Sequence, residues 1–153
     1  MGLGDITHTA APLPEIIYRA KGTGTLAAGN AVAFDSSGNV IPATTSTLAP
    51  HGILTALTHV VGATTYYGVA MRGYVVGKAA GAIKPNKLVL SDAVGDLTEV
   101  STTVSATPTQ AEIQTIWKPV GRYVRVDAVD NQYAASDAAD NDSIIISVGA
   151  GWN

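Results

Sequence analysis

The chain has 153 residues and a net charge of −3, with 46% hydrophobic residues, 14% charged residues and no cysteine, and this length fits one domain. The lack of cysteine excludes disulfides, thiolate metal sites and a cysteine nucleophile, and the scattered Lys and Arg residues argue against nucleic acid as a partner. Gly, Thr and Pro interrupt the apolar stretches before they reach the roughly 20 residues of a membrane-spanning helix, so the apolar excess indicates a surface that binds protein.

Residues 1–17 are expected to form an extended N-terminal arm, because they contain Pro12 and Pro14 and have no helical period. Sixteen extended residues reach about 50 Å, which is far enough to lie on a neighbouring protein; a disordered tail is the alternative. The arm lacks the basic and apolar regions of a secretory signal. It also has Ile6 where myristoylation requires Ser or Thr.

Residues 18–153 are expected to form a single all-β domain, a compact barrel or sandwich. Short runs rich in Val, Ile, Thr and Tyr are cut by Gly, Asn, Asp and Pro, which is typical of strands joined by turns. No window of 11 residues has the period of an amphipathic helix, although residues 132–140 could form one or two helical turns. Strands are predicted at residues 16–20, 31–34, 39–41, 52–57, 66–71, 74–78, 87–90, 97–100, 112–117, 122–128 and 143–148.

Two segments share the pattern of a β-hairpin. The sequences NAVAFDSSGNV, from Asn30, and NKLVLSDAVGDL, from Asn86, each contain a four-residue strand and a polar loop with Gly. This pattern predicts hairpins closed by loops of four or five residues. The match is short, so the composition common to hairpins is favoured over an internal duplication as its cause. We interpret Asp35 and the two serines after it as turn residues, because they have no base or phosphate-loop context.

Signatures of catalysis and ligand binding are weak. The G-x-S-x-G nucleophile elbow is absent, and His8, His51 and His59 are not spaced i, i+4 from one another. The glycine-rich residues 20–30 lack the GK[ST] of a phosphate-binding loop. We therefore expect no catalytic residue, no metal site and no cofactor.

The segment DAVDNQYAASDAADNDS carries oxygen ligands of the kind that calcium prefers. It lacks the D-x-D-x-D-G spacing and the closing Glu of a calcium loop. A solvated acidic loop before the last strand is the favoured interpretation, and calcium binding is left open. The acidic residues concerned are Asp127, Asp130, Asp137, Asp140 and Asp142.

Large aromatic residues near predicted strand ends are candidate anchors of an interface, where amphipathic rings are enriched. Packing in the core is favoured for Trp117, and a contact with another chain is favoured for Trp152. The candidate anchors are Trp117, Tyr123, Tyr133 and Trp152.

The order of the segments is similar to that of a known family. AGNAVAFDSSGNVIPAT, PHGILTAL, YYGVAMRGYVVGKAAGAIKPNKLVLSDAVGDLTEV and PVGRYVRVDAVDN, followed by SIIISVGAG, together resemble the small capsid decoration proteins of tailed viruses. The resemblance is to the group now described as capsid cement proteins, formerly a family of unknown function, and it covers about residues 18–150. The segment STTVSATPTQAEIQTIWKP is longer than the family's usual segment there, and the arm has no match.

The resemblance implies a barrel-like protein that is not an enzyme and that acts as a homotrimer on the outer surface of the virion. Its partner is then the major capsid protein, and its role is to stabilise the assembled icosahedral shell by bridging neighbouring capsid subunits. A virion-associated carbohydrate-binding β-module or a small β-barrel hydrolase is the alternative. The residues that we expect to contact the capsid or another subunit are Leu3, Ile6, Leu13, Ile16 and Trp152.

Overall fold

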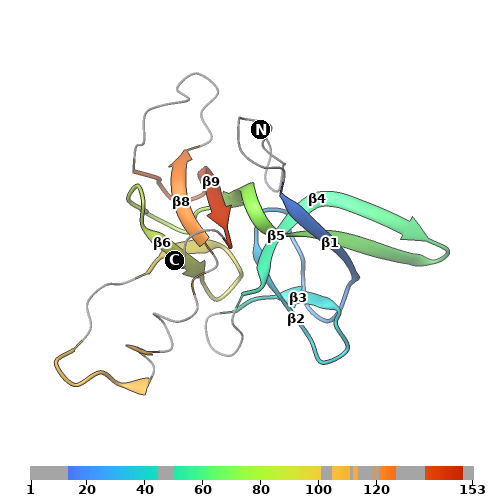
Figure 1. Cartoon of the computed structure of the whole chain (residues 1–153), viewed down its shortest axis with the longest axis horizontal. Helices are drawn as coiled ribbons and strands as arrows, with labels where there is room; N and C mark the ends of the chain where they lie inside the picture. Colours follow the sequence, from blue (N-terminus) through green and yellow to red (C-terminus); the bar gives the residue numbers. More distant parts are fainter. Residues whose placement is uncertain are drawn as a thin grey trace.

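The computed structural model describes residues 14–44, 50–100, 105–110, 112–113, 119, 121–126 and 137–149. Nine β-strands lie within these residues (Figure 1). Their bounds are β1 Glu15–Ala20, β2 Ala31–Phe34, β3 Val40–Pro42, β4 Gly52–Val61, β5 Thr64–Lys78, β6 Leu88–Ser91, β7 Leu97–Glu99, β8 Gly121–Val126 and β9 Ser143–Val148.

The strands form a curled antiparallel sheet, which confirms the predicted all-β, barrel-like fold. The order in the sheet is β3-β2-β4-β5-β9-β8-β6-β7, and β1 pairs with β5 outside this path. Strand β5 is shared: residues 64–72 pair with β4 and β1, whereas residues 73–78 pair with β9. The strands predicted separately at residues 66–71 and 74–78 are therefore one continuous strand.

The pairing shows that the chain contains the same five-strand unit twice. Unit 1 consists of β1 to β4 and residues 64–72 of β5, in the order β3-β2-β4-β5-β1. Unit 2 consists of residues 73–78 of β5 and β6 to β9, in the order β7-β6-β8-β9-β5. In each unit the first strand in the chain pairs with the last, and the register of β4 and of β8 shifts after the third residue of the strand.

The hairpin loops of the two units, residues 35–39 and 92–96, have the same geometry. In both, the first aspartate accepts hydrogen bonds from the N–H groups of the third and fifth loop residues, at 2.8 and 2.9 Å. The fourth loop residue is Gly38 or Gly95, with φ of +77° or +94°, a conformation that favours glycine. The predicted hairpins are confirmed, but their likeness is part of a structural repeat and is not explained by hairpin composition alone.

Each unit also curls back on itself through one parallel bridge. Lys21, which follows β1, pairs with Val40 of β3, and Ala79, which follows β5, pairs with Leu97 of β7. These bridges join the first strand of each unit to its third strand, which lies at the opposite edge of the same five strands. The small, closed units explain the barrel-like curvature of the sheet.

Close approach of neighbouring strands requires glycine at one matched position in each unit. Gly52 pairs with Val32 in unit 1, and Gly121 pairs with Val89 in unit 2. A Cβ atom at Gly52 would collide with the carbonyl oxygen of Ala70, and one at Gly121 would collide with the backbone of β9. The glycine of the repeated P-x-G sequence, which is the first residue of β4 and of β8, therefore has a steric origin.

The hydrophobic core follows the same division. Unit 1 has its own buried cluster, formed by Val32, Val40, Leu54 and Val69. Val89, Leu97 and Ile146, which match Val32, Val40 and Val69 in unit 2, belong to a larger cluster. That cluster also contains buried residues of unit 1, namely Ala31, Ala33, Ala43, Ile53 and Ala70. Fully burying a Val, Leu or Ile side chain contributes about 1.5–3 kcal/mol, so this shared cluster holds the two units together.

The strand predicted at residues 112–117 is wrong at its beginning. Glu112 Oε2 accepts a hydrogen bond from the N–H of Thr109 at 2.6 Å, and the N–H of Glu112 donates to Thr109 Oγ1 at 3.2 Å. The N–H of Ile113 donates to the carbonyl of Thr109 at 3.1 Å, so this T-x-x-E sequence is a capping box that begins a helical turn. Hydrogen bonds from Thr109 and then Ser105 lower the pKa of Glu112 to about 2. Residues 114–117 lie outside the described residues.

Two further predictions concern segments that are only partly described. One or two helical turns were considered possible at residues 132–140. Ala138 instead pairs with Ile83 in an antiparallel bridge, and residues 132–136 lie outside the described residues. The last residues of the predicted arm, 15–17, belong to β1, and residues 1–13 are likewise outside it.

Candidate functional site: an uncharged, exposed hairpin

Strands β4 and β5 project from unit 1 as a long hairpin (Figure 1). Strand β2 pairs with β4 only at Gly52 and Ile53, and residues 58–61 then pair with residues 64–67 of β5. Among the described strands, none pairs with the outer edge of β4 beyond Ile53. We call residues 55–67 the projecting hairpin.

The projecting hairpin carries three of the six large apolar side chains that are exposed on the described surface, and the neighbouring strand β1 carries a fourth. Val60 is 63% exposed and Val61 is 56% exposed, and Leu57 and the neighbouring Tyr18 of β1 are also exposed. Only two other large apolar side chains of the described residues, Val94 and Ile113, are similarly exposed. Exposed apolar groups gathered at one place are typical of a surface that binds protein.

This part of the chain also carries no charge. Residues 52–71, GILTALTHVVGATTYYGVAM, contain no Asp, Glu, Lys or Arg. Proteins commonly protect an exposed strand edge with Lys, Pro or an inward-pointing charge, because unpaired backbone groups there attract other strands. The outer edge of β4 has none of these protective residues.

The side chains of the projecting hairpin alternate between two faces, as in any β-strand. Leu57, His59 and Val61 share one face, and Thr58 and Val60 share the other. The ring of His59 lies 6.4 Å from that of Tyr18 in an edge-to-face arrangement. The first face therefore joins β4 to β1 in one apolar and aromatic surface.

A bulge fixes where the projecting hairpin leaves unit 1. The register of β4 against β5 shifts between Leu54 and Thr58. Thr55, which is 2% exposed, donates from its Oγ1 to the carbonyl of Gly68 at 2.8 Å and accepts from the N–H of Leu57 at 3.2 Å. Bulges increase the local twist and redirect a strand, so these bonds set the direction of the hairpin.

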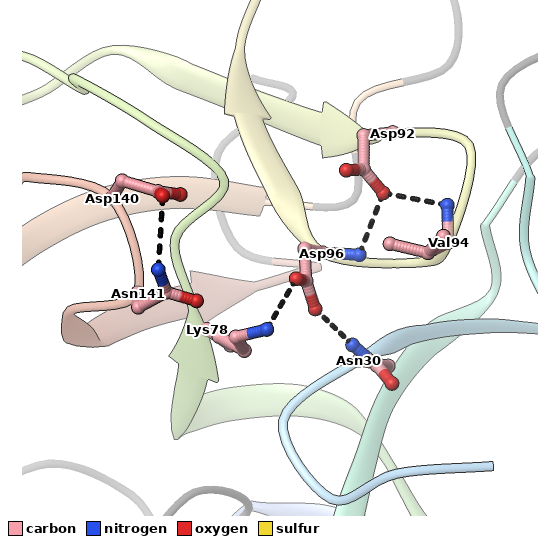
Figure 2. Close-up of polar contacts among 7 residues, drawn as sticks. All are labelled: Asn30, Lys78, Asp92, Val94, Asp96, Asp140 and Asn141. Carbon is pink, nitrogen blue, oxygen red and sulfur yellow. Dashed lines mark hydrogen bonds and ion pairs between the residues drawn. The ribbon is translucent and has the colours of Figure 1, made fainter.

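A second candidate lies at the junction of the two units, where a buried carboxylate is fully engaged (Figure 2). Asp96 Oδ1 accepts a hydrogen bond from Asn30 Nδ2 at 2.5 Å, and Asp96 Oδ2 lies 2.6 Å from Lys78 Nζ. Asn30 belongs to the segment before β2 of unit 1, whereas Lys78 and Asp96 belong to unit 2. Because both oxygens of Asp96 are occupied, this group links the units and is not poised for proton transfer.

The same junction borders a pocket of about 510 Å³. Asn30, Lys78 and Asp96 already bond to one another, and the remaining lining residues are mostly small. We therefore assign it no ligand. The lining residues are Thr25, Ala27, Ala28, Asn30, Lys78, Val94 and Asp96.

Electrostatics support the structural role of this junction. The hydrogen bond to Asp96 raises the pKa of Lys78 above its ordinary value of 10.5, against the effect of burial. A pKa raised by folding contributes stability below the unfolded value, and that stability is lost only as the pH rises through the folded value. The Lys78–Asp96 pair therefore stabilises the protein at any pH below about 10.5 at which Asp96 is ionised.

Most of the residues predicted to make contacts fall outside the description. Ile16 lies in β1, half-buried and paired with Ala70, on the strand that flanks the projecting hairpin. Ile16 therefore lies beside the candidate surface. The predicted contact and anchor residues outside the described residues are Leu3, Ile6, Leu13, Trp117, Tyr133 and Trp152; for Tyr123 only the backbone, in β8, is described.

The residues considered for catalysis or metal binding are dispersed. His51 is exposed and its ring lies 5.0 Å from that of Phe34, whereas His59 is on the projecting hairpin and His8 is outside the described residues. Asp142 Oδ2 accepts from the N–H of Ala139 at 2.7 Å, which is a turn contact. Within the described ranges, no group of three or more His, Asp or Glu side chains could hold a metal ion.

Reasoning from the sequence did not identify the projecting hairpin. The predicted strand ended at residue 57, because THVVGATT lacks the buried alternation that marks a strand with a core face. The available signal was the 20-residue stretch without charge that surrounds a Val-Val-Gly-Ala turn. A long uncharged segment that the core does not require is a sign of a binding surface.

Comparisons with known proteins do not assign the chain to a family. No family model matches it, and no curated protein matches it at a significant level. In the part of the chain that the structure describes, no helix has the length and hydrophobicity needed to cross a membrane.

Proposed function

We propose that this protein is a viral capsid decoration, or cement, protein. It binds the assembled icosahedral shell of a tailed virus from outside, as a trimer, and stabilises the shell by bridging neighbouring copies of the major capsid protein. Both the order of its sequence segments and the character of its exposed surface support this proposal.

The observation that carries the proposal is the projecting hairpin. It combines exposed Val60 and Val61 with a free strand edge and a complete lack of charged residues. Such a surface gains free energy when apolar area and unpaired backbone groups are covered by another protein. Its exposed apolar and aromatic side chains suit a protein whose role is attachment.

The proposed mechanism is attachment through several weak contacts at once. One projecting hairpin provides only a small contact, and small interfaces are individually weak. When one subunit of a trimer has bound, the other two bind at a high effective concentration, and the overall affinity exceeds that of a single contact by orders of magnitude. A trimer that contacts several capsid subunits then holds those subunits together.

The N-terminal arm contributes a second contact in this proposal. Strand β1, which flanks the projecting hairpin, begins at Glu15, and residues 1–13 precede it in the sequence. Leu3, Ile6 and Leu13 supply apolar side chains, and the extended backbone supplies hydrogen bonds to a neighbouring subunit or to the shell. Deleting residues 2–13 should reduce occupancy on the shell while leaving the β-domain folded, as judged by circular dichroism.

The proposal is tested by adding the purified protein to shells that lack it and sedimenting the mixture. We expect saturable binding with a stoichiometry in multiples of three and a raised disruption temperature of the shell. An absence of binding to such shells would overturn the proposal. Binding to a glycan array without binding to shells would favour the carbohydrate-binding alternative.

A further inference from the structure

We propose that two copies of this chain pair through the free outer edges of β4. The two edges lie side by side and antiparallel about a twofold axis, so that the strands β1, β5 and β4 of one copy continue into β4, β5 and β1 of the other. This contact covers the same projecting hairpin that the proposed attachment to a shell uses, so it is proposed for the free protein and is tested without a shell.

The outer edge of β4 has unpaired backbone groups that another strand can bind. The backbone of Leu54 still bonds to Gly29 and Asn30 on the outer side of β4, and beyond Leu54 no described strand pairs with that side. Every second residue of an edge strand directs its N–H and C=O groups outward, and another strand satisfies these groups best. Residues 56–61 are exposed along this whole length, so a second strand can reach them.

The other edge of the same three strands, formed by β1, is protected against the addition of a strand. Strand β1 has the sequence EIIYRA, which includes the charged residues Glu15 and Arg19. Lys21 follows it directly. The side chains of Glu15 and Arg19 are exposed. Charges of this kind discourage the addition of a strand. Of the two edges, only that of β4 is suited to pairing.

A second copy of the chain is the partner that suits the outer edge of β4. In a twofold contact each residue meets either its own copy or a close neighbour of it, so a charged residue would face a like charge. Residues 52–71 carry no Asp, Glu, Lys or Arg. When the edge of β4 meets a second copy of itself, it therefore brings no like charges of these residue types together.

Apolar side chains set the register of the pair. With the twofold axis at His59, Leu57 lies opposite Val61 of the second copy, and Thr58 lies opposite Val60. Each pair consists of residues that point to the same face, as directly opposed residues in a sheet must. Both highly exposed valines, at 63% and 56%, are then covered by the second copy.

The register is tested by a single engineered cysteine, since the chain has none. In His59→Cys the new thiol lies opposite its own copy, at the Cα separation of about 4.5–5.5 Å that a disulfide accepts. Mild oxidation should give a covalent dimer in non-reducing electrophoresis. Thr64→Cys is the control, because Thr64 is exposed on β5, away from the edge. This variant should give no covalent dimer.

The interface itself is tested by charge at matched exposed valines, without any shell present. Val60→Lys should weaken self-association by about tenfold or more, because the change occurs twice in each pair and removes two apolar contacts. Val94→Lys is the control, since Val94 is 64% exposed but lies in a loop of unit 2. Sedimentation velocity over a range of concentrations measures both variants.

Two results would overturn the proposal. One is a wild-type mass that does not change with concentration and equals that of Val60→Lys; the other is a failure of His59→Cys to cross-link while the wild-type protein self-associates. If Val60→Lys loses shell binding but keeps its mass, the edge is occupied by the capsid protein, and only the proposed pair fails. If pairing is found and shells are not bound, only the proposed function fails.

Discussion

Asp96 and Asn39 occupy the same position in the two matched loops, but they have different partners. Asn39 donates from Nδ2 to Asp35 within its own loop at 3.3 Å, whereas Asp96 binds Asn30 and Lys78 across the junction. A single side chain thus decides whether a loop closes on itself or links two units. Since the loop of unit 1 already has Asn there, Asn at position 96 is compatible with the backbone.

Asp96→Asn should therefore keep the fold and remove the ion pair. We expect the free energy of unfolding to fall by about 1 kcal/mol, because the Lys78 side chain is 30% exposed and solvent screens the pair. Urea unfolding measures the change, and the loss should shrink at high salt. Lys78→Met provides a double-mutant cycle; a coupling energy of zero between the two changes would contradict the role of the pair.

Asp35 predicts a dependence of stability on acid. The N–H of Asn39, together with that of Ser37, holds the pKa of Asp35 below its ordinary value of 3.8. A pKa lowered by folding contributes stability above the unfolded value, and this stability is lost as the pH falls through the folded value. Wild type should be more stable than Asp35→Asn at pH 6, and the difference should shrink as the pH falls below 3.8. A constant difference in the unfolding free energy across this range would be inconsistent with the assignment.

The elements illustrate what local sequence can and cannot specify. Both hairpin loops were predictable, because D-x-x-G-[ND] places an aspartate where it bonds its own turn and a glycine where φ is positive. The repeat was not, because EIIYRA of β1 and GYVVGK of β5 hold matched places without sharing a pattern. Their equivalence depends on pairing with distant strands, which no local window contains.

The projecting hairpin was missed for a related reason. Hydrophobic alternation reports burial against a core, and residues 56–61 are exposed on both faces. The segment remains a strand because β5 pairs with it, not because a core selects its side chains. The strand predicted at residue 112 failed differently: the capping box at Thr109 was a local signal that the β-rich composition outweighed.

Two matched glycines give a prediction at the scale of the elements. Gly52→Ala and Gly121→Ala should each lower the free energy of unfolding by about 2 kcal/mol or more, because each Cβ meets the backbone of the adjacent strand. Gly38→Ala should cost only about 1 kcal/mol, since its φ is +77° but no atom lies within 4 Å of the new Cβ. Thermal and urea unfolding rank the three variants. Equal losses at all three positions would show that close approach is not the cause.

For the whole molecule, the shared strand and the shared core predict one cooperative unfolding transition. Val75 and Val76 of β5 are fully buried, and the larger cluster includes residues of both units. Their amides should exchange with deuterium only through global unfolding, whereas the amides at the tip of the projecting hairpin should exchange much faster. Native-state hydrogen exchange measured by NMR tests this. A unit 2 that exchanges as a separate block would contradict it.

Strand β5 gives the molecule a direction of mechanical strength. Its 15 residues span about 50 Å. Strands β1 and β4 pair antiparallel with its first part in unit 1, and β9 pairs antiparallel with its second part in unit 2. A pull along β5 must therefore shear many hydrogen bonds at the same moment, whereas a pull across it would open them one after another. A molecule that bridges neighbours under tension resists best when the load runs along this strand.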